Sequence, residues 1–387
     1  MQDKRLFYLV IALITVSILA AYSLSTYATL HFGYSQFHFF VRQLVSGIIA
    51  IILLWLIASK LSPQKAHIFG VWLFVVSFVL MIAMSFMPSS LVTAVGGAKR
   101  WIKLPGFSIA PVEFFKVGFV YFLAWSFTRK FQNFHRENLG REIVSILPYI
   151  ALFLIAVLSI AIFQNDIGQV MVLGLTLSFM LLFAGRSFKL FSLLMGLAIA
   201  LFVLFVSISH NRIERIKMWW ASAQKIILSY LPPSLAQELK LDNAKESYQI
   251  INSLHAIHHG GIVGQGLGNG AIKLGFLSDV HTDFVLAGLT EELGYIGLAA
   301  IIAIYIFIIH RILRIANRAQ DRTTYLFAVG VASLLGFSLL INSYGISSLI
   351  PVKGLAVPFL SYGGSSLLAN AIAIGLVLAL TKKATAR

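Results

Sequence analysis

Long runs of apolar residues, separated by shorter polar segments, dominate the pattern along the chain. An α-helix needs about 20 such residues to cross a bilayer, and shorter runs can be completed by helix tilt and flanking residues. The pattern therefore predicts an all-α polytopic membrane protein with ten transmembrane helices, forming a single integral membrane domain over residues 1–387. The predicted helices are residues 6–25, 41–58, 68–87, 112–127, 143–163, 170–184, 190–209, 284–309, 325–344 and 366–380.

The polar segments differ in positive charge, and this difference predicts the orientation. The first apolar run has no clear small-residue cleavage site, so we interpret it as a span rather than a signal peptide. With the amino terminus inside, 17 of the 30 Lys and Arg residues fall in cytoplasmic segments. Such an excess is typical of cytoplasmic loops, which predicts that both termini are cytoplasmic. Residues 210–282, between the seventh and eighth helices, then form a large extracytoplasmic loop. We expect interfacial helices there, with Trp219 and Trp220 as membrane-interface anchors.

Composition supports this class of protein. Hydrophobic residues make up 59% of the chain and charged residues only 11%, whereas soluble proteins carry about 25% charged residues. The net charge of +16 is explained mainly by the cytoplasmic loops, so we predict no nucleic-acid partner. The absence of cysteine excludes disulfides and thiol chemistry.

Some positive charge lies on the predicted outer face, where the orientation rule disfavours it. Arg100 lies in the segment 88–110, Arg212, Arg215 and Lys273 lie in the large loop, and Lys353 lies in the segment 346–365. Because these cations oppose the rule, an anionic partner on the outer face is a plausible reason for them.

Ionisable residues in or beside predicted helices are expensive and are therefore candidates for function. Glu113 and Lys116 are three residues apart on one helix face, so they either form a structural ion pair or bind substrate. Asp166 precedes the sixth helix and is predicted mainly as its N-cap. Asp283 precedes the eighth helix, but Thr282 could cap that helix equally well, which leaves Asp283 as the strongest catalytic candidate.

The eighth helix also contains Glu291 and Glu292, which fall on different sides of it. Both cannot face lipid, so the helix must be buried in protein or line a cavity. Glu291 falls on the same side as Asp283 and is a possible tuner of its pKa within one cavity.

Glycines crowd residues 260–270, just before this helix. No strand precedes them and no βαβ pattern surrounds them, so we reject a dinucleotide-binding motif. The alternatives are a mobile lid or a close approach to phosphate, and a hinged loop without ligand contact. Neighbouring histidines, including His255, His259 and His281, lack a completing set of ligands, so we predict no histidine metal site.

Several motifs, taken together and in order, resemble the SEDS family of peptidoglycan polymerases. They are GGAKRWI at 96–102, PVEFFK at 111–116, QNDIG at 164–168, NRIERI at 211–216, YQIINSLHAIHHGGIVGQGLG at 248–268, HTDFVLAGLTEELG at 281–294 and PVKGLAVPFLSYGGSS at 351–366. Lys353 and the SYGGSS sequence resemble the cell-division branch more than the elongation branch. The family pattern is altered at Val112, at Asn165 and at Ser278-Asp279, which leaves any serine role at 112 and the loop geometry before His281 in doubt.

The resemblance implies a glycosyltransferase of the bacterial inner membrane that polymerises lipid II, enriched at the division septum. The family's essential aspartate corresponds to Asp283, its essential arginine to Arg100, and its fourth-helix glutamate and lysine to Glu113 and Lys116. Asp283 is then the base, and Arg100 and Lys116 are counter-charges for the diphosphate leaving group. Weaker candidates for the same role are Lys353, Arg212 and Arg215.

A divalent cation, Mg²⁺ or Mn²⁺, is a possible cofactor at the diphosphate. The implied partners are lipid II, membrane lipid, a class B penicillin-binding protein and other division proteins. Alternatives from other classes are an elongation polymerase, a lipid II flippase and a scaffold without enzymatic activity. The pKa of Asp283 is open at this point, because a helix N-terminus lowers it whereas burial and nearby carboxylates raise it.

Overall fold

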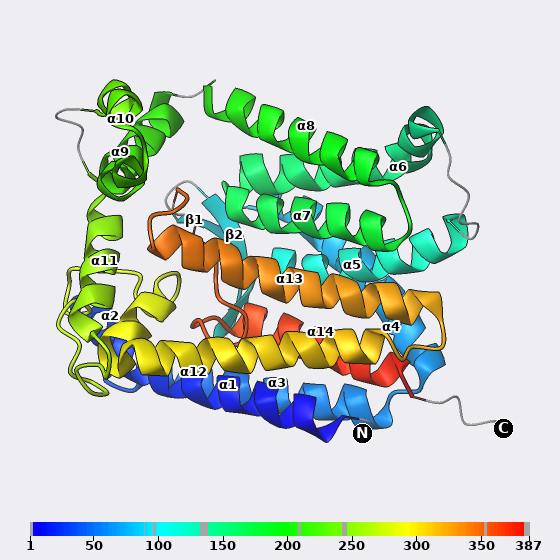
Figure 1. The fold of residues 1–387 in the computed structure, drawn as a ribbon. Helices are drawn as coiled ribbons and strands as arrows, with labels where there is room; N and C mark the ends of the chain where they lie inside the picture. The colour runs from blue at the N-terminus through cyan, green and yellow to red at the C-terminus, as the bar shows by residue number, and fades with distance from the viewer. Residues whose placement is uncertain are drawn as a thin grey trace.

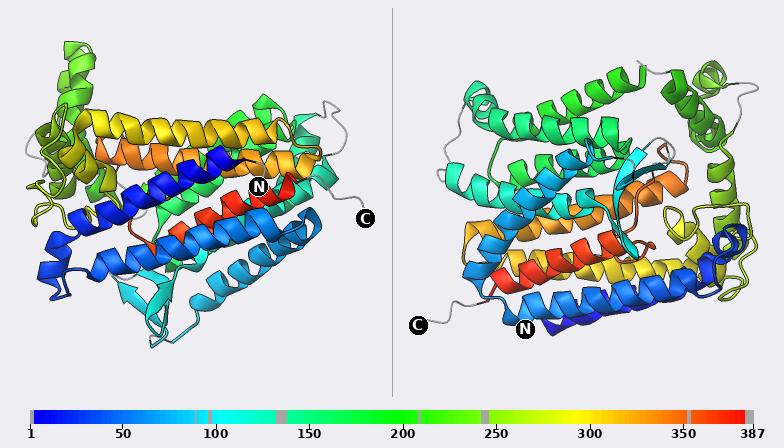
Figure 2. Two further views of the ribbon diagram at one scale, coloured as in Figure 1. Left: turned by 90° about the horizontal axis from the view of Figure 1, so that it is seen from below. Right: turned by 180° about the vertical axis from the view of Figure 1, so that it is seen from behind.

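Helices that run alongside one another form most of the molecule, in a computed structural model of the whole chain (Figure 1). The structure describes residues 3–88, 90–95, 98–131, 138–207, 210–241, 246–351 and 354–382. Figure 2 shows the same helices from below and from behind, with the helices of the 210–260 segment at one end of the bundle. The first residue of the first helix and the last residue of the last helix lie together at the other end.

The bundle consists of helices that overlap all ten segments predicted as spans. They are α1 (Lys4–Leu24), α3 (His38–Lys60), α4 (Pro63–Met84), α5 (Pro111–Lys130), α6 (Leu139–Leu158), α7 (Ile167–Phe183), α8 (Phe188–Ser207), α12 (Val285–Ala316), α13 (Arg322–Ile346) and α14 (Gly364–Leu380). A π-helical turn, η1 (Ser159–Phe163), extends α6. Within the described residues, six helices are long and apolar enough to cross a membrane, and further apolar helices are shorter. The chain is an integral membrane protein.

One connection contains strands, which corrects the prediction of an all-α fold. Strands β1 (Val92–Val95), β2 (Ala98–Leu104) and β3 (Phe107–Ile109) form an antiparallel sheet in the order β1-β2-β3. The two residues between β2 and β3 are Pro105 and Gly106, and Gly106 has a φ of +83°. A proline-glycine pair between apolar, β-branched segments is a turn signal, so the sequence did contain a sign of this hairpin.

Four short elements fill the connection between α8 and α12, together with the small helix α2 (Thr26–His31) nearby (Figure 1). They are α9 (His210–Ile227), the 3₁₀ turn η2 (Leu228–Tyr230), α10 (Pro233–Leu239) and α11 (Tyr248–Gly260). Trp219 donates a hydrogen bond to the carbonyl of Ser348 (2.9 Å), and Trp220 donates one to the carbonyl of Leu239 (2.9 Å). Trp219 therefore ties α9 to the residues after α13, and Trp220 ties α9 to α10, a role beyond the interface anchoring predicted for them.

Polar contacts fasten α1 to α12 near both ends of α1. Arg311 forms an ion pair with Asp3 (2.5 Å). At the opposite end, the Ser23 hydroxyl donates to a carboxylate oxygen of Glu292 (2.5 Å). Both contacts join residues more than 260 positions apart in the chain, separated by 308 and 269 residues. The first helix is thus held in place by one of the last.

Candidate active site

Arg100 projects from β2 and binds the segment that precedes α7. Its Nε donates to the carbonyl of Gln164 (2.8 Å) and its Nη2 donates to the carbonyl of Asn165 (2.9 Å). Its Nη1 lies 3.8 Å from Asp166 Oδ2. A guanidinium has five N–H donors in a rigid fork, so donors remain for an anion. The sheet that sequence reasoning missed is therefore the element that positions this residue.

Asp166 carries out the predicted capping and also belongs to the site. Its Oδ1 accepts a hydrogen bond from the Gln169 backbone N–H at the start of α7 (3.2 Å). Burial raises the pKa of this carboxyl, while Arg100 and the backbone hydrogen bond oppose that rise. The side chain is thus both a helix cap and part of a charged cluster with Arg100.

Glu113 and Lys116 form an ion pair within α5, as one of the two sequence interpretations predicted. Lys116 Nζ lies 2.9 Å from Glu113 Oε2, and both side chains are 8% exposed. Gln169 of α7 donates to Glu113 Oε1 (2.9 Å). The charges of Lys116 and Glu113 both act on Asp166, so the pair lies close to the Arg100 cluster. The pairing does not exclude contact with substrate.

Asp283 lies in a turn two residues before α12 begins. Its backbone N–H donates to the carbonyl of Asp279 (3.1 Å), and its own carbonyl accepts from the Asn342 side chain (2.6 Å). A Cβ placed on Gly354 would lie 2.6 Å from Asp283 Oδ2, so the carboxylate lies against the backbone there. Across the described residues this carboxylate receives no hydrogen bond.

The environment of Asp283 raises its pKa to about 7. Burial is the main cause, the charges of Asp279 and Asp166 add to it, and Arg100 opposes it. The sequence left open whether the helix N-terminus lowers the pKa of Asp283 or burial raises it. Burial has the larger effect, since Asp283 lies outside the helix and its carboxylate accepts no capping hydrogen bond from the described residues. A general base is most effective when its pKa lies near the working pH.

Residues that sequence reasoning did not single out support Asp283. Asn342, in α13, also donates to the carbonyl of Leu355 (2.8 Å), so it joins the turn to the loop that follows α13. The negative charge of Asp279 raises the pKa of Asp283. Asn342 had a usable signal, because a buried polar side chain in an apolar helix needs a partner.

His281 serves as a packing residue in the turn that leads to Asp283. Burial lowers its pKa to about 4, so the ring is neutral. The ring packs edge-on against Phe39 (5.0 Å between centroids). In the described part of the chain, no three His, Cys, Asp or Glu side chains gather as a metal site.

Glu291 binds the glycine-rich segment and is not among the charges that shift the pKa of Asp283. Its Oε1 accepts bonds from His259 Nδ1 (2.9 Å) and from the backbone N–H groups of Ala271 (2.8 Å) and Ile272 (3.1 Å). The side chain is 1% exposed. Glu291 therefore fixes the glycine-rich segment to α12.

The glycine-rich segment pairs with a break in α12. Gly294 has a φ of +68° inside the helix. At this break, the N–H groups of Tyr295 and Ile296 donate to the carbonyls of Gly261 (2.9 Å) and Ile262 (3.1 Å). In the other direction, Gln265 N–H donates to the carbonyl of Glu291 (3.0 Å). The loop thus satisfies backbone groups that the break exposes.

Substitution of Gly260 tests this close packing. A Cβ at Gly260 would lie 2.0 Å from the carbonyl oxygen of Thr290, so we expect Gly260→Ala to lower the melting temperature clearly. Gly140→Ala is the matched control, because nothing lies within 4 Å of a Cβ there. Thermal unfolding of both variants in the same detergent is the measurement. Equal melting temperatures would show that the loop does not pack in this way.

Lys273 is buried in an ion pair, which corrects its interpretation as an outer cation awaiting an anionic partner. Its Nζ lies 2.6 Å from Glu292 Oε1, and the two side chains are 3% and 0% exposed. The same ammonium donates to Ser23 Oγ (3.0 Å) and to the carbonyl of Gly268 (2.8 Å). This pair joins α1, the glycine-rich segment and α12.

Removing Lys273 should therefore destabilise the protein strongly. Lys273→Met leaves Glu292 buried without its counter-charge, which typically costs about 3–5 kcal/mol. The control is Lys217→Met, because Lys217 and Glu214 form an exposed pair (2.9 Å), and exposed ion pairs contribute little to stability. Unfolding monitored by temperature or denaturant should separate the two variants, and equal stability of both would refute the structural role.

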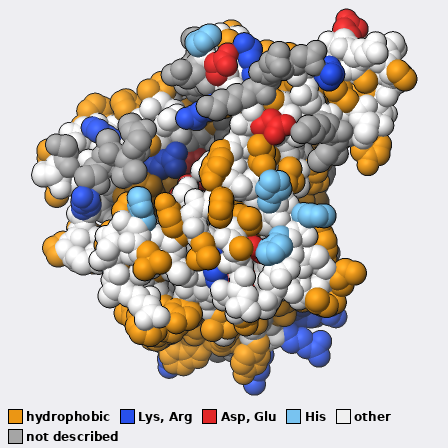
Figure 3. Space-filling model, turned by 90° about the vertical axis from the view of Figure 1, so that its left-hand side faces the viewer, with side chains coloured by type: hydrophobic (Ala, Val, Ile, Leu, Met, Phe, Trp, Pro, Cys, Tyr) orange, Lys and Arg blue, Asp and Glu red, His pale blue; other side chains and the backbone are white. Residues whose placement is uncertain are grey.

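The three weaker candidates for diphosphate binding are cations of the outer segments. Arg215 lies exposed on α9, and the described structure gives it no contact with Arg100, Lys116 or Asp283. The side chain of Arg212 and the whole of Lys353 lie outside the described residues. Figure 3 views the end of the molecule that carries α9 to α11 and shows a basic group beside acidic ones in a hollow.

Comparison with known proteins decides the family. The model of the cell cycle protein family FtsW/RodA/SpoVE matches residues 4–386. The chain belongs to the FtsW/RodA/SpoVE family. The SEDS resemblance inferred from the motifs is therefore confirmed over nearly the whole chain.

Relatives of this FtsW/RodA/SpoVE protein share most of its length. A "Probable peptidoglycan glycosyltransferase FtsW" of Helicobacter pylori (strain J99) is 48% identical over 382 residues, which are 98% of each chain. The protein of the same name from Trichlorobacter lovleyi is 33% identical over 381 residues, 97% of this chain and 92% of its own.

Solved structures with the same fold are more distant in sequence. A chain of a peptidoglycan synthase complex, described as coordinating polymerization and crosslinking, superposes with a TM-score of 0.71 at 24% identity and covers 98% of this chain and 97% of that one. The rod shape determining protein RodA of Thermus thermophilus has a TM-score of 0.64 at 20% identity, covering 100% and 98%. At these identities the likeness supports the fold alone.

Proposed function

We propose that the chain is a peptidoglycan glycosyltransferase that polymerises lipid II into glycan strands at the division septum. Asp283 carries this proposal, because its side chain is partly buried, its carboxylate receives no hydrogen bond from the described residues and its pKa is about 7. Near neutral pH such a group accepts a proton readily. The name of the relatives, which share up to 48% identity with this chain, favours the division role over elongation.

The reaction joins a sugar hydroxyl to the anomeric carbon of a lipid-linked glycan. The hydroxyl oxygen forms the new glycosidic bond and its proton passes to a carboxylate oxygen of Asp283. The bond from the anomeric carbon to the lipid diphosphate breaks, and the electron pair leaves with the diphosphate. Arg100 stabilises this developing charge through its remaining N–H donors. Lys116 adds positive charge, and Glu113 orients it through the ion pair (2.9 Å).

Lys353, Arg212 and Arg215 extend this role as weaker contacts to the diphosphate. All three are cations of segments that the orientation places outside. A divalent cation, Mg²⁺ or Mn²⁺, is a further proposal. The described residues do not provide a ligand set of their own, so the diphosphate oxygens would have to supply most of the ligands, and no step is assigned to the metal.

We further propose that all ten apolar helices cross the bacterial inner membrane, with both termini in the cytoplasm and α9 to α11 outside. The distribution of Lys and Arg supports this orientation, as does the position of the start of α1 and the end of α14 at one end of the bundle (Figure 1). The partner is a class B penicillin-binding protein, in keeping with the relative that functions in a peptidoglycan synthase complex. Membrane lipid and other division proteins complete the environment.

The deciding experiment is a polymerisation assay with the purified chain and lipid II, with and without the transpeptidase and the divalent cation. Glycan strands made by the wild-type protein support the enzyme. Movement of lipid II across vesicles without any glycan would indicate a flippase instead. If the wild-type chain makes no glycan but recruits the transpeptidase, and Arg100→Ala and Asp283→Ala leave that recruitment unchanged, the chain is a scaffold.

A further inference from the structure

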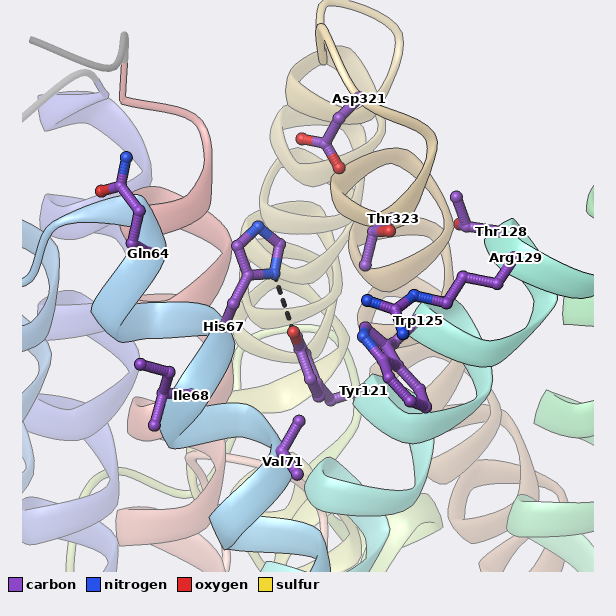
Figure 4. A pocket seen from close by; sticks show the side chains of 10 residues that line it. All are labelled: Gln64, His67, Ile68, Val71, Tyr121, Trp125, Thr128, Arg129, Asp321 and Thr323. Carbon is purple, nitrogen blue, oxygen red and sulfur yellow. Dashed lines mark hydrogen bonds between the residues drawn. The ribbon is translucent and has the colours of Figure 1, made fainter. Parts of the chain in front are cut away.

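A cavity of about 590 Å³ opens beside Asp321, which follows the end of α12, whereas Asp283 precedes the start of that helix. The start of α4, the end of α5 and the start of α13 form its walls (Figure 4). Sites for small molecules typically have volumes of about 300–1,000 Å³. The reaction assigned to Asp283 uses none of the residues that line this cavity.

The rim of the cavity carries one positive and one negative side chain. The Arg129 guanidinium lies over the Trp125 ring, with its carbon 4.2 Å from the ring centroid. Asp321 is held in place because its Oδ1 accepts from the Thr324 backbone N–H (2.8 Å). Among the described residues, neither side chain forms an ion pair. Figure 4 shows the two on either side of Thr323.

Deeper in the cavity the lining becomes neutral and then apolar. His67 and Tyr121 hydrogen-bond to each other (2.7 Å) and line it between α4 and α5. Ile68 and Val71 continue along α4 and remain 60% and 38% exposed. In a membrane protein, exposed apolar side chains of this kind contact lipid tails. The cavity thus passes from charged groups at its rim to a surface that faces the bilayer.

We propose that this cavity binds a phospholipid with a zwitterionic headgroup that ends in a primary amine. The phosphate contacts Arg129, the ammonium contacts Asp321, and an acyl chain follows Ile68 and Val71. One cation and one anion match this headgroup in number and sign. A lipid diphosphate has two negative groups, and the second would meet the Asp321 carboxylate without a counter-charge. A choline headgroup has no N–H to donate to Asp321.

The test uses the full chain purified in detergent and titrated with three lipids of identical acyl chains, with bound lipid counted by native mass spectrometry. The lipids are phosphatidylethanolamine, phosphatidylcholine and phosphatidylglycerol. We expect phosphatidylethanolamine to bind about tenfold more tightly than the other two, because a hydrogen bond between charged groups is worth a factor of this order. Equal affinities for the three lipids would overturn the proposal.

Two variants locate the site. Asp321→Asn keeps the cap of α13, since Asn caps helices as well as Asp, and removes the charge. It should abolish the preference for phosphatidylethanolamine. Arg129→Gln should weaken binding of all three lipids, and Arg129→Lys should restore part of it.

The matched control is Lys60→Gln, because Lys60 lies over the Trp55 ring (5.9 Å) at the same end of the bundle but outside the cavity. It should leave all three affinities unchanged. A loss equal to that of Arg129→Gln would show general charge attraction and refute the site. Tighter binding of a polyprenyl diphosphate than of phosphatidylethanolamine would also refute it.

Discussion

Asp283→Asn should reduce lipid II polymerisation by about 10²–10⁴-fold, the range that a general base contributes. Asparagine has nearly the shape of aspartate but cannot accept the hydroxyl proton. The backbone bonds of residue 283 to Asp279 and Asn342 do not involve the carboxylate and should persist. The measurement is the initial rate of glycan formation by purified protein, with substrate saturating and subsaturating.

The stability of Asp283→Asn separates catalysis from folding. The pKa of this carboxyl is about 7 in the folded protein, against an ordinary value of 3.8. As pH rises from about 4 to about 7, the unfolded chain loses this proton first, so the folded state loses stability. Asparagine has no such proton, so at neutral pH the variant should be at least as stable as the wild type. An inactive variant that is also less stable would point to a structural role.

The wild-type enzyme should also lose activity as the pH falls below about 7, because the base becomes protonated. Asp279→Asn removes a negative charge that raises the pKa of Asp283, so the acidic limb of its pH–rate profile should move to lower pH. An unchanged limb would mean that another group controls the profile.

Arg100→Ala should reduce polymerisation by about 10²–10³-fold, which is the usual cost of removing one donor that stabilises developing negative charge. Arg100→Lys should recover only part of the rate. Lysine keeps the charge, but its single ammonium cannot reproduce the paired bonds to the carbonyls of Gln164 (2.8 Å) and Asn165 (2.9 Å).

Arg100 has two effects, stabilisation of the leaving diphosphate and a lowering of the pKa of Asp283, and the pH profile distinguishes them. Its charge opposes the rise in the pKa values of Asp283 and Asp166, so Arg100→Ala should move the acidic limb to higher pH, opposite to Asp279→Asn. Lys217→Ala is the control, since Lys217 is 53% exposed and paired with Glu214 (2.9 Å) on α9, and its effect should be much smaller. An equal loss from both variants would remove the special role given to Arg100.

The sequence predicted the apolar helices well because a membrane span has a strong and local signal. It also indicated the pairing of Glu113 with Lys116, since residues three apart on a helix are neighbours. The sheet that carries Arg100 was missed, although Pro105 and Gly106 marked its turn. The strands are short, and their pattern was hidden among longer apolar runs.

Other parts of the site depend on contacts between distant segments, which one sequence does not reveal. Helical spacing placed Glu291 on the same side as Asp283, but Asp283 lies before the helix and Glu291 meets the glycine-rich segment instead. Counting charges by loop assigned Lys273 to the outer surface. Its partner Glu292 is 19 residues further along the chain, inside a predicted span, so counting charges in loops does not connect the two.

The two polar contacts between α1 and α12 imply an order of assembly. α1 is made before α12, and Ser23 and Asp3 meet Glu292 and Arg311 only after 269 and 308 further residues have been added. Until then α1 must remain in the membrane without these two contacts to α12. We expect α1 to remain free to move relative to the other helices through most of synthesis. Its contacts with α12, made when α12 enters the membrane, then fix its position.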